Sequence, residues 1–144
     1  MALLMPVKGL HRCERECTRL CHDFAAAVDS RQYGMFADLF APDGVFDRAG
    51  QVSYGQAEIL QFLNARPADK VTRHACTNIR IDMTGPQAAT GHSYVLVFQG
   101  QALGDAQQPL PTTAPMVVEY QDNYVLMAEG WKFKHRVVKI VFQP

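Results

Sequence analysis

The chain has 144 residues, and its 14 lysines and arginines balance its 14 aspartates and glutamates. A formal net charge of zero argues against nucleic-acid binding, which needs a strong positive field. The length is that of a single domain, residues 1–144, large enough to fold without disulfides or a metal. The longest apolar runs are well short of the ~20 residues that span a bilayer, and a signal peptide's apolar stretch is missing. We therefore expect no membrane partner and a cytoplasmic location.

A first helix is predicted over residues 9–29, where apolar side chains recur at three- and four-residue steps. Asp29 continues this apolar face, four residues beyond Ala25. A buried, unpaired carboxylate costs several kcal/mol or takes up a proton. Asp29 therefore needs a partner or a task, and His74 and His92 are candidates for both. The alternative is that Asp29 caps the N-terminus of the next helix.

The cysteines carry little sign of a metal site. Cys13, Cys17 and Cys21 lie at four-residue steps on the same helix face, and Cys76 is distant in the sequence. Zinc sites usually use CxxC pairs, whereas thiols along one helix point in parallel. We expect small, reduced core side chains.

A second helix is expected over residues 30–40, followed by a turn at residues 41–44, where proline and glycine stand close together. A short hairpin over residues 45–54 and a third helix from Gly55 to about Asn64 come next. The period then changes from helical to alternating. Long strands are predicted over residues 72–83, 88–99, 114–126 and 131–142.

Two features of these strands bear on the site. The proline-bearing stretch of residues 100–115 is predicted to be a loop and a lid or mouth of a pocket. Lys132, Lys134 and Arg136 alternate along the last strand, a pattern typical of a solvated face. Helices followed by long antiparallel strands indicate an α+β domain in which a curved sheet wraps around the helices.

This order of elements is similar to the cystatin-like α+β cone of the SnoaL-like and nuclear transport factor 2-like superfamily. Local sequences strengthen the resemblance, namely Ala27–Tyr33, Phe36, Leu39–Asp47, Tyr54–Ile59 and Gly130–Phe133. The resemblance covers about Leu10 to Phe142. It implies a cone-shaped barrel, made of a strongly curved, mixed and mainly antiparallel sheet wrapped around three N-terminal helices.

Within the superfamily the chain most resembles the scytalone dehydratase, hexachlorocyclohexane dehydrochlorinase and bile acid dehydratase branch. Asp29, His74 and His92 carry this match, each in its local sequence. The resemblance implies that His74 is a base, that Asp29 orients it, and that His92 is the second histidine of the scytalone dehydratase type. Val28 and Arg48 stand where that type has tyrosines, and its Ser and Asn pair on the fourth strand is missing, so we do not expect scytalone as the substrate.

The expected reaction is proton abstraction and elimination on a hydrophobic, cyclic small molecule by a lyase or isomerase. Histidine suits this chemistry because its pKa lies near working pH, and no cofactor or metal is needed. His92 would protonate the leaving oxygen or polarise a carbonyl. A simple hairpin register places His74 and His92 roughly 13 Å apart. We expect substrate contacts from Phe24, Tyr33, Tyr54, Phe98, Tyr120 and His135.

Two other functions fit the same scaffold. A noncatalytic ligand-binding or assembly module would need no bond between Asp29 and His74, and its cavity would be shallow or filled. A β-subunit-like partner of a ring-hydroxylating oxygenase has only the fold in its favour. In each case we expect a homodimer or homotrimer. Asp47, Arg48 and Glu119 are weaker candidates for the pocket mouth, His135 has a structural hydrogen bond as its alternative, and His11 and His22 are expected on the surface.

Overall fold

The computed structural model describes residues 7–102, 104 and 109–144. These residues form three helices, α1 (Val7–Asp29), α2 (Tyr33–Asp38) and α3 (Gly55–Asn64). They also form six strands: β1 (Phe40–Arg48), β2 (Gln51–Tyr54), β3 (Lys70–Gly85), β4 (Ala88–Gln101), β5 (Met116–Met127) and β6 (Gly130–Phe142). None of the described helices is long and apolar enough to cross a membrane.

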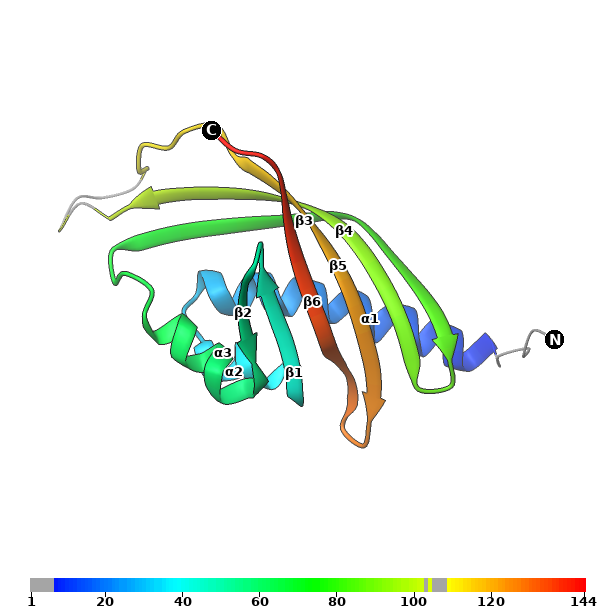
Figure 1. Ribbon diagram of the computed structural model, residues 1–144. Helices are drawn as coiled ribbons and strands as arrows, with labels where there is room; N and C mark the ends of the chain where they lie inside the picture. Colours follow the sequence, from blue (N-terminus) through cyan, green and yellow to red (C-terminus); the bar gives the residue numbers. More distant parts are fainter. Residues whose placement is uncertain (1–6, 103, 105–108) are drawn as a thin grey trace.

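The strands form one mixed sheet in the order β2-β1-β6-β5-β4-β3. Only β1 and β6 pair in parallel; the other neighbours are antiparallel. Figure 1 shows the sheet curving around α1, with α2 and α3 beside β1 and β2. The predicted α+β architecture and its curved, mainly antiparallel sheet are confirmed. The sheet is open between β2 and β3 and does not close into a barrel.

Helix α1 buries the predicted apolar face against the concave side of the sheet. Cys13, Cys17 and Cys21 are each 0% exposed, so they are core side chains as expected. Phe24 lies in the same stripe, and its ring packs near the rings of five other aromatic residues. The helix is therefore held by apolar packing along its length, which fixes the position of its last residue, Asp29.

Two local predictions are corrected. The second helix is shorter than expected because the chain after α1 turns through Arg31, whose φ is +61°. The turn expected at residues 41–44 lies inside β1, where the pairing with β6 shifts register between Phe40 and Val45. Pro42 and Gly44 lie within this irregular stretch of the strand. A Cβ on Gly44 would lie 2.9 Å from the carbonyl oxygen of Ala41, so the close approach requires glycine.

The four long strands are confirmed, but the face assigned to Arg136 is wrong. A register shift between β5 and β6 pairs Asn123 with His135 and Tyr124 with Phe133, leaving Lys134 extra. A bulge of this kind reverses the side on which the following residues point. Arg136 is therefore fully buried, while Lys134 is exposed.

Buried Arg136 is paired with a buried carboxylate. Its Nε and Nη2 donate to the two carboxylate oxygens of Asp122 at 2.7 and 2.8 Å. Nη2 also lies 3.2 Å from the sulfur of Cys21 on α1. Tyr124 donates to Asp122 at 3.0 Å. This cluster ties α1 to the centre of the sheet.

The predicted loop after β4 is also present. Gln101 ends β4 and Met116 begins β5, and residues 103 and 105–108 between them lie outside the described residues. The prediction that this loop is a lid falls partly on those residues and stays a prediction.

Candidate active site

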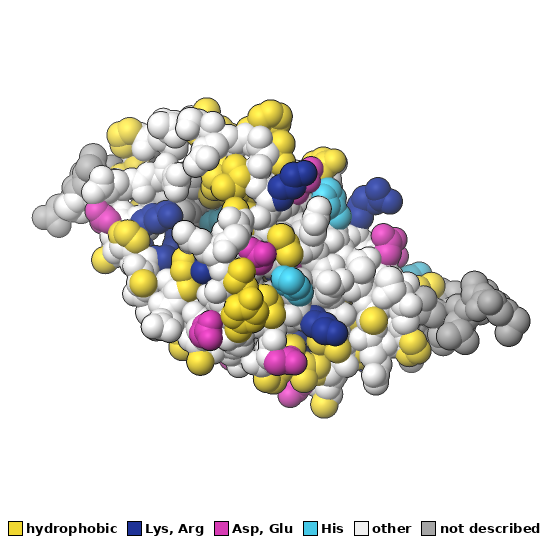
Figure 2. Space-filling model, in the orientation of Figure 1, with side chains coloured by type: hydrophobic (Ala, Val, Ile, Leu, Met, Phe, Trp, Pro, Cys, Tyr) yellow, Lys and Arg dark blue, Asp and Glu magenta, His cyan; other side chains and the backbone are white. Residues whose placement is uncertain are grey.

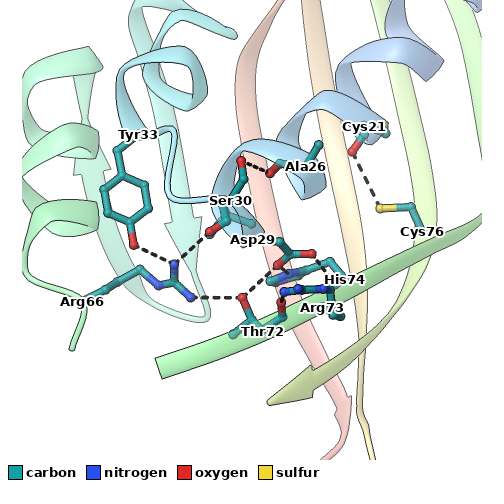
Figure 3. A network of polar contacts seen from close by, with 11 residues as sticks. Cys21, Ala26, Asp29, Ser30, Tyr33, Arg66, Thr72, Arg73, His74 and Cys76 are labelled. Carbon is teal, nitrogen blue, oxygen red and sulfur yellow. Dashed lines mark hydrogen bonds and ion pairs between the residues drawn. The ribbon is translucent and has the colours of Figure 1, made fainter. Parts of the chain in front are cut away.

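Asp29 and His74 meet on the concave side of the sheet. Oδ1 of Asp29 lies 2.7 Å from Nδ1 of His74, and Oδ2 accepts the backbone N–H of His74 at 2.9 Å. Both side chains are only 13% exposed. Figure 3 shows Asp29 at the end of α1 facing His74 on β3. The predicted contact is confirmed, and the alternative that Asp29 caps α2 is wrong, since Gln32 occupies that position without a side-chain cap.

The carboxylate of Asp29 is held in its ionised form. Burial raises its pKa, but hydrogen bonds and charge interaction with His74, together with the Thr72 hydroxyl, outweigh burial and leave the pKa below its ordinary value. Thr72 donates to Oδ1 at 2.8 Å. Because an ionised carboxylate only accepts hydrogen bonds, it fixes the proton of His74 on Nδ1.

A second layer of contacts holds this pair in place. Arg66, just after α3, donates to the Thr72 hydroxyl at 3.2 Å and to the Tyr33 hydroxyl at 2.9 Å. It also donates to the carbonyl oxygen of Val28, beside Asp29, at 3.1 Å. The arrangement is visible in Figure 3, where Arg66 bridges Tyr33 and Thr72. Arg66 thus links α1, α2 and β3 around the carboxylate.

His74 lines a cavity of about 230 Å³ between the helices and the sheet. Its Nε2 makes no hydrogen bond to the described residues, and this nitrogen is the one that carries no proton when Nδ1 does. The lining is mainly apolar and aromatic, and consists of Phe24, Val28, Phe36, Phe46, Arg48, Ala49, Phe62, Leu63, Arg66, Lys70, Thr72, His74, Val97, Gln99, Met116, Val118, Tyr120, Val138 and Ile140. The site therefore combines a free imidazole nitrogen with an apolar chamber.

Tyr120 brings a hydroxyl to the same cavity. The residue is 3% exposed, and its hydroxyl makes no hydrogen bond to any other described residue. Burial raises its pKa well above the ordinary value, with Arg136 opposing the rise, so the phenol stays protonated. The Arg136 guanidinium lies 4.1 Å from the centre of the Tyr120 ring and holds it from behind. A protonated phenol in an apolar cavity can donate a hydrogen bond to a substrate oxygen.

His92 does not line this cavity, which corrects its expected role as a second site histidine. His74 pairs with Val97 on β4, and His92 lies five residues from Val97 along that strand. An odd separation along a strand puts side chains on opposite faces, so His92 lies on the outer face. Its Nε2 is 3.5 Å from a Glu119 carboxylate oxygen. His92 pairs with Arg80, because β3 shifts register between Thr77 and Arg80.

The remaining candidates divide in the same way. Phe24 and Tyr120 line the cavity, and Tyr33 reaches the site only through Arg66. Tyr54 and Phe98 are 64% and 38% exposed and do not line it. His135 lies beside Val45, away from the cavity, and its buried Nε2 has no partner among the described residues. The expected substrate contacts of Tyr54, Phe98 and His135 are therefore not found in this cavity.

Several site residues were not identified from the sequence. These residues are Arg66, Lys70 and Thr72. A signal for Thr72 exists, because it lies two residues before His74 and so shares its strand face. Arg66 follows α3 and carries no comparable signal. Within the described residues, no group of three or more His, Cys, Asp or Glu side chains is placed to hold a metal ion.

Known proteins share the fold of this chain. The SnoaL-like domain family matches residues 12–137. A putative scytalone dehydratase from Novosphingobium aromaticivorans superposes with a TM-score of 0.79 at 20% identity, covering 95% of this chain and 89% of that one. An NTF2-like protein with a cystatin-like fold from the same organism superposes with a TM-score of 0.77 at 17% identity, covering 94% of this chain and 86% of that one. LinA superposes with a TM-score of 0.74 at 23% identity, covering 89% of this chain and 88% of that one. None of the curated proteins matches the chain.

The chain belongs to the SnoaL-like domain family. The family match spans most of the chain, including Asp29, His74 and His92. Similar structures include a putative dehydratase as well as proteins of unknown function. At these identities the likeness to the three structures above establishes the fold, and the reaction has to be argued from the site.

Proposed function

We propose that the protein is a cofactor-independent lyase or isomerase that removes a proton next to a carbonyl in a hydrophobic, cyclic small molecule. The observation that carries this proposal is the contact of the Asp29 carboxylate with Nδ1 of His74, which leaves Nε2 free at the wall of an apolar cavity. A noncatalytic ligand-binding module would use the cavity but would not need the contact between Asp29 and His74. The dehydratase named among similar structures supports the same class of reaction.

The first step is proton removal. Nε2 of His74 takes a proton from the carbon beside the carbonyl, the electron pair of that C–H bond forms a C=C bond, and the π pair of the carbonyl moves onto its oxygen. Asp29 stabilises the imidazolium that forms and keeps the ring in the required tautomer. The Tyr120 hydroxyl donates a hydrogen bond to the resulting enolate oxygen.

The second step is loss of the leaving group. In a dehydration, the enolate electrons re-form the carbonyl and a C=C bond while the C–O bond to the β-hydroxyl breaks. The departing oxygen takes the proton from Nε2 of His74 and leaves as water, which restores neutral His74. The same residue thus serves as base and acid, so the site needs no contribution from His92. Return of the proton to a different carbon gives isomerisation.

The proposal is tested with a bicyclic β-hydroxyketone, 3-hydroxy-1-tetralone, whose dehydration gives 1-naphthol and is followed by absorbance. The His74→Ala variant should lose about 10²- to 10⁴-fold in rate, because that is the usual contribution of a general base. His92→Ala is the matched control, since it removes the same side-chain type from the outer face of the sheet. Circular dichroism and urea unfolding confirm that both variants fold. Equal rates for wild type and a folded His74→Ala would remove His74 from the mechanism.

A further inference from the structure

The cavity is divided into an apolar interior and a cationic rim. Its interior is formed by fully buried side chains such as Phe36, Leu63 and Val118. Three cationic side chains, Arg48, Arg66 and Lys70, also line it, and all are partly exposed. We call these three the cationic rim. No Asp or Glu is among the described residues that line the cavity.

The charges of the rim are not neutralised by the protein. None of the ion pairs found among the described residues involves Arg48, Arg66 or Lys70. The carboxylate of Asp29 already accepts hydrogen bonds from His74 and Thr72 on both of its oxygens. The charge of Asp47 acts on Arg48 without an ion pair between them, and one Asp47 oxygen accepts the backbone N–H of Gly50.

Arg48 keeps free donors at the cavity. Its guanidinium lies 3.5 Å from the centre of the Phe62 ring, which fixes its plane. Nη1 donates to the Ser53 hydroxyl at 3.0 Å, Nε is buried without a partner, and Nη2 makes no hydrogen bond to the described residues. A ligand in the cavity can supply an acceptor for the unused N–H groups of Nη2.

Lys70 begins β3 and extends the rim. Its ammonium group makes no hydrogen bond to the described residues, and burial together with the positive charge of Arg66 lowers its pKa. Two cations held close in a partly desolvated place repel each other, which lowers the pKa of Lys70. An anion bound between them would raise that pKa again. The rim thus has the electrostatic character of an anion site next to an apolar chamber.

We propose that the substrate carries an anionic oxygen group, a carboxylate or a phosphate, which Arg48, Arg66 and Lys70 bind at the rim while its ring system fills the apolar interior. This inference rests on the proposed function, because it places the reacting carbon near His74. The anionic group would orient the ring in the cavity and set the choice among otherwise similar apolar molecules.

The test is a binding measurement that does not depend on turnover. Isothermal titration compares 2-naphthoate, 2-naphthyl phosphate and the neutral 2-naphthamide, which share one ring system. At low salt we expect both anions to bind about tenfold or more tightly than the amide, with the difference falling as salt screens the charges. The tighter of the two anions identifies the preferred group.

Lys70→Gln removes one rim charge without removing a hydrogen bond to the described residues, and should reduce the preference for anions about threefold or more. Lys139→Gln is the matched control, because Lys139 is exposed on β6 and does not line the cavity. Equal binding of naphthoate and naphthamide to the wild type, or equal effects of the two lysine variants, would overturn the inference.

The two proposals fail separately. The His74→Ala variant should keep the preference for anions while it loses dehydration, since His74 is outside the rim. A preference for anions in a protein whose turnover does not depend on His74 would leave the anion site standing and refute the mechanism. Turnover that depends on His74, without any preference for anions, would leave the mechanism standing and refute the anion site.

Discussion

At the scale of single residues, the site is built around a carboxylate that the sequence puts at an unfavourable position. Asp29 continues the apolar face of α1 and would be costly there without partners. The structure supplies the ring and backbone of His74 and the hydroxyl of Thr72. Three donors to one carboxylate make Asp29 an orienting group, and they leave the role of base to His74.

Replacing Asp29 by Asn should destabilise the protein in a pH-dependent way. At pH 7 we expect a loss of about 1–3 kcal/mol, the usual worth of hydrogen bonds to a charged, buried group. Because the pKa of Asp29 is lowered by folding, its stabilisation is present above the ordinary value of 3.8 and is lost as pH falls through the folded value. Urea unfolding of both proteins from pH 7 to pH 3 measures this, and a difference that grows toward acid pH would contradict the account.

The Asp29 and His74 pair could be predicted because Asp29 continues the apolar face of α1 and the local sequences of both residues resemble those of the dehydratase branch. The outer position of His92 could not, because it depends on strand parity and on a register shift between Thr77 and Arg80. The cationic rim could not be predicted either. Arg48, Arg66 and Lys70 come from the ends of three different elements, and only the fold brings them together.

At the scale of elements, the end of α1 decides where Asp29 points. The N–H of Gln32 donates to the carbonyl of Ala27 and that of Arg31 to Val28, which is a Schellman closure with Arg31 in the left-handed conformation. Glycine is usual there. Arginine is present because its guanidinium donates to the Pro67 and Lys70 carbonyls and so joins the end of α1 to the start of β3.

Two substitutions at Arg31 separate the backbone from the side chain. Arg31→Ala keeps the strained backbone and loses the contacts, so we expect a loss of about 1–2 kcal/mol. Arg31→Gly loses the same contacts but relieves about 1 kcal/mol of strain, so it should be the more stable of the two. Chemical unfolding decides between them. A glycine variant as unstable as the alanine variant would show that backbone strain is unimportant here.

The long elements could be predicted from the sequence, because apolar side chains repeat at a regular period over many residues in α1 and in β3 to β6. The local irregularities within these elements could not be predicted in this way. The extra residue at Lys134 reverses the faces of β6, and the proline and glycine at residues 41–44 bend β1 without ending it. Both irregularities are set by pairing with neighbouring strands, which a single stretch of sequence does not contain.

At the scale of the whole molecule, the buried pair of Asp122 and Arg136 joins α1 to the sheet behind the cavity. Figure 2 shows charged and histidine side chains among apolar ones on one face of the surface, but this ion pair is fully inside. A buried pair is costly to break, because removal of one partner leaves the other charge uncompensated. Homodimer or homotrimer formation stays a prediction that sedimentation would decide.

We expect Arg136→Met to destabilise the protein by about 3–5 kcal/mol, and the double variant Asp122→Leu with Arg136→Met to recover much of that loss. Thermal and urea unfolding provide the comparison, with Lys134→Met as an exposed control on the same strand. If the double variant is less stable than the single one, Asp122 contributes independently of Arg136.

The central claim is that His74 removes a proton from a carbon next to a carbonyl. Proton NMR of 2-tetralone in D₂O follows this step alone, because each proton removed is replaced by deuterium whether or not a leaving group is present. We predict that the wild type accelerates exchange over buffer, that Asp29→Asn slows it about tenfold or more, and that His74→Ala reduces it to the buffer rate. Exchange that is equally fast in the wild type and in a folded His74→Ala variant would contradict the account.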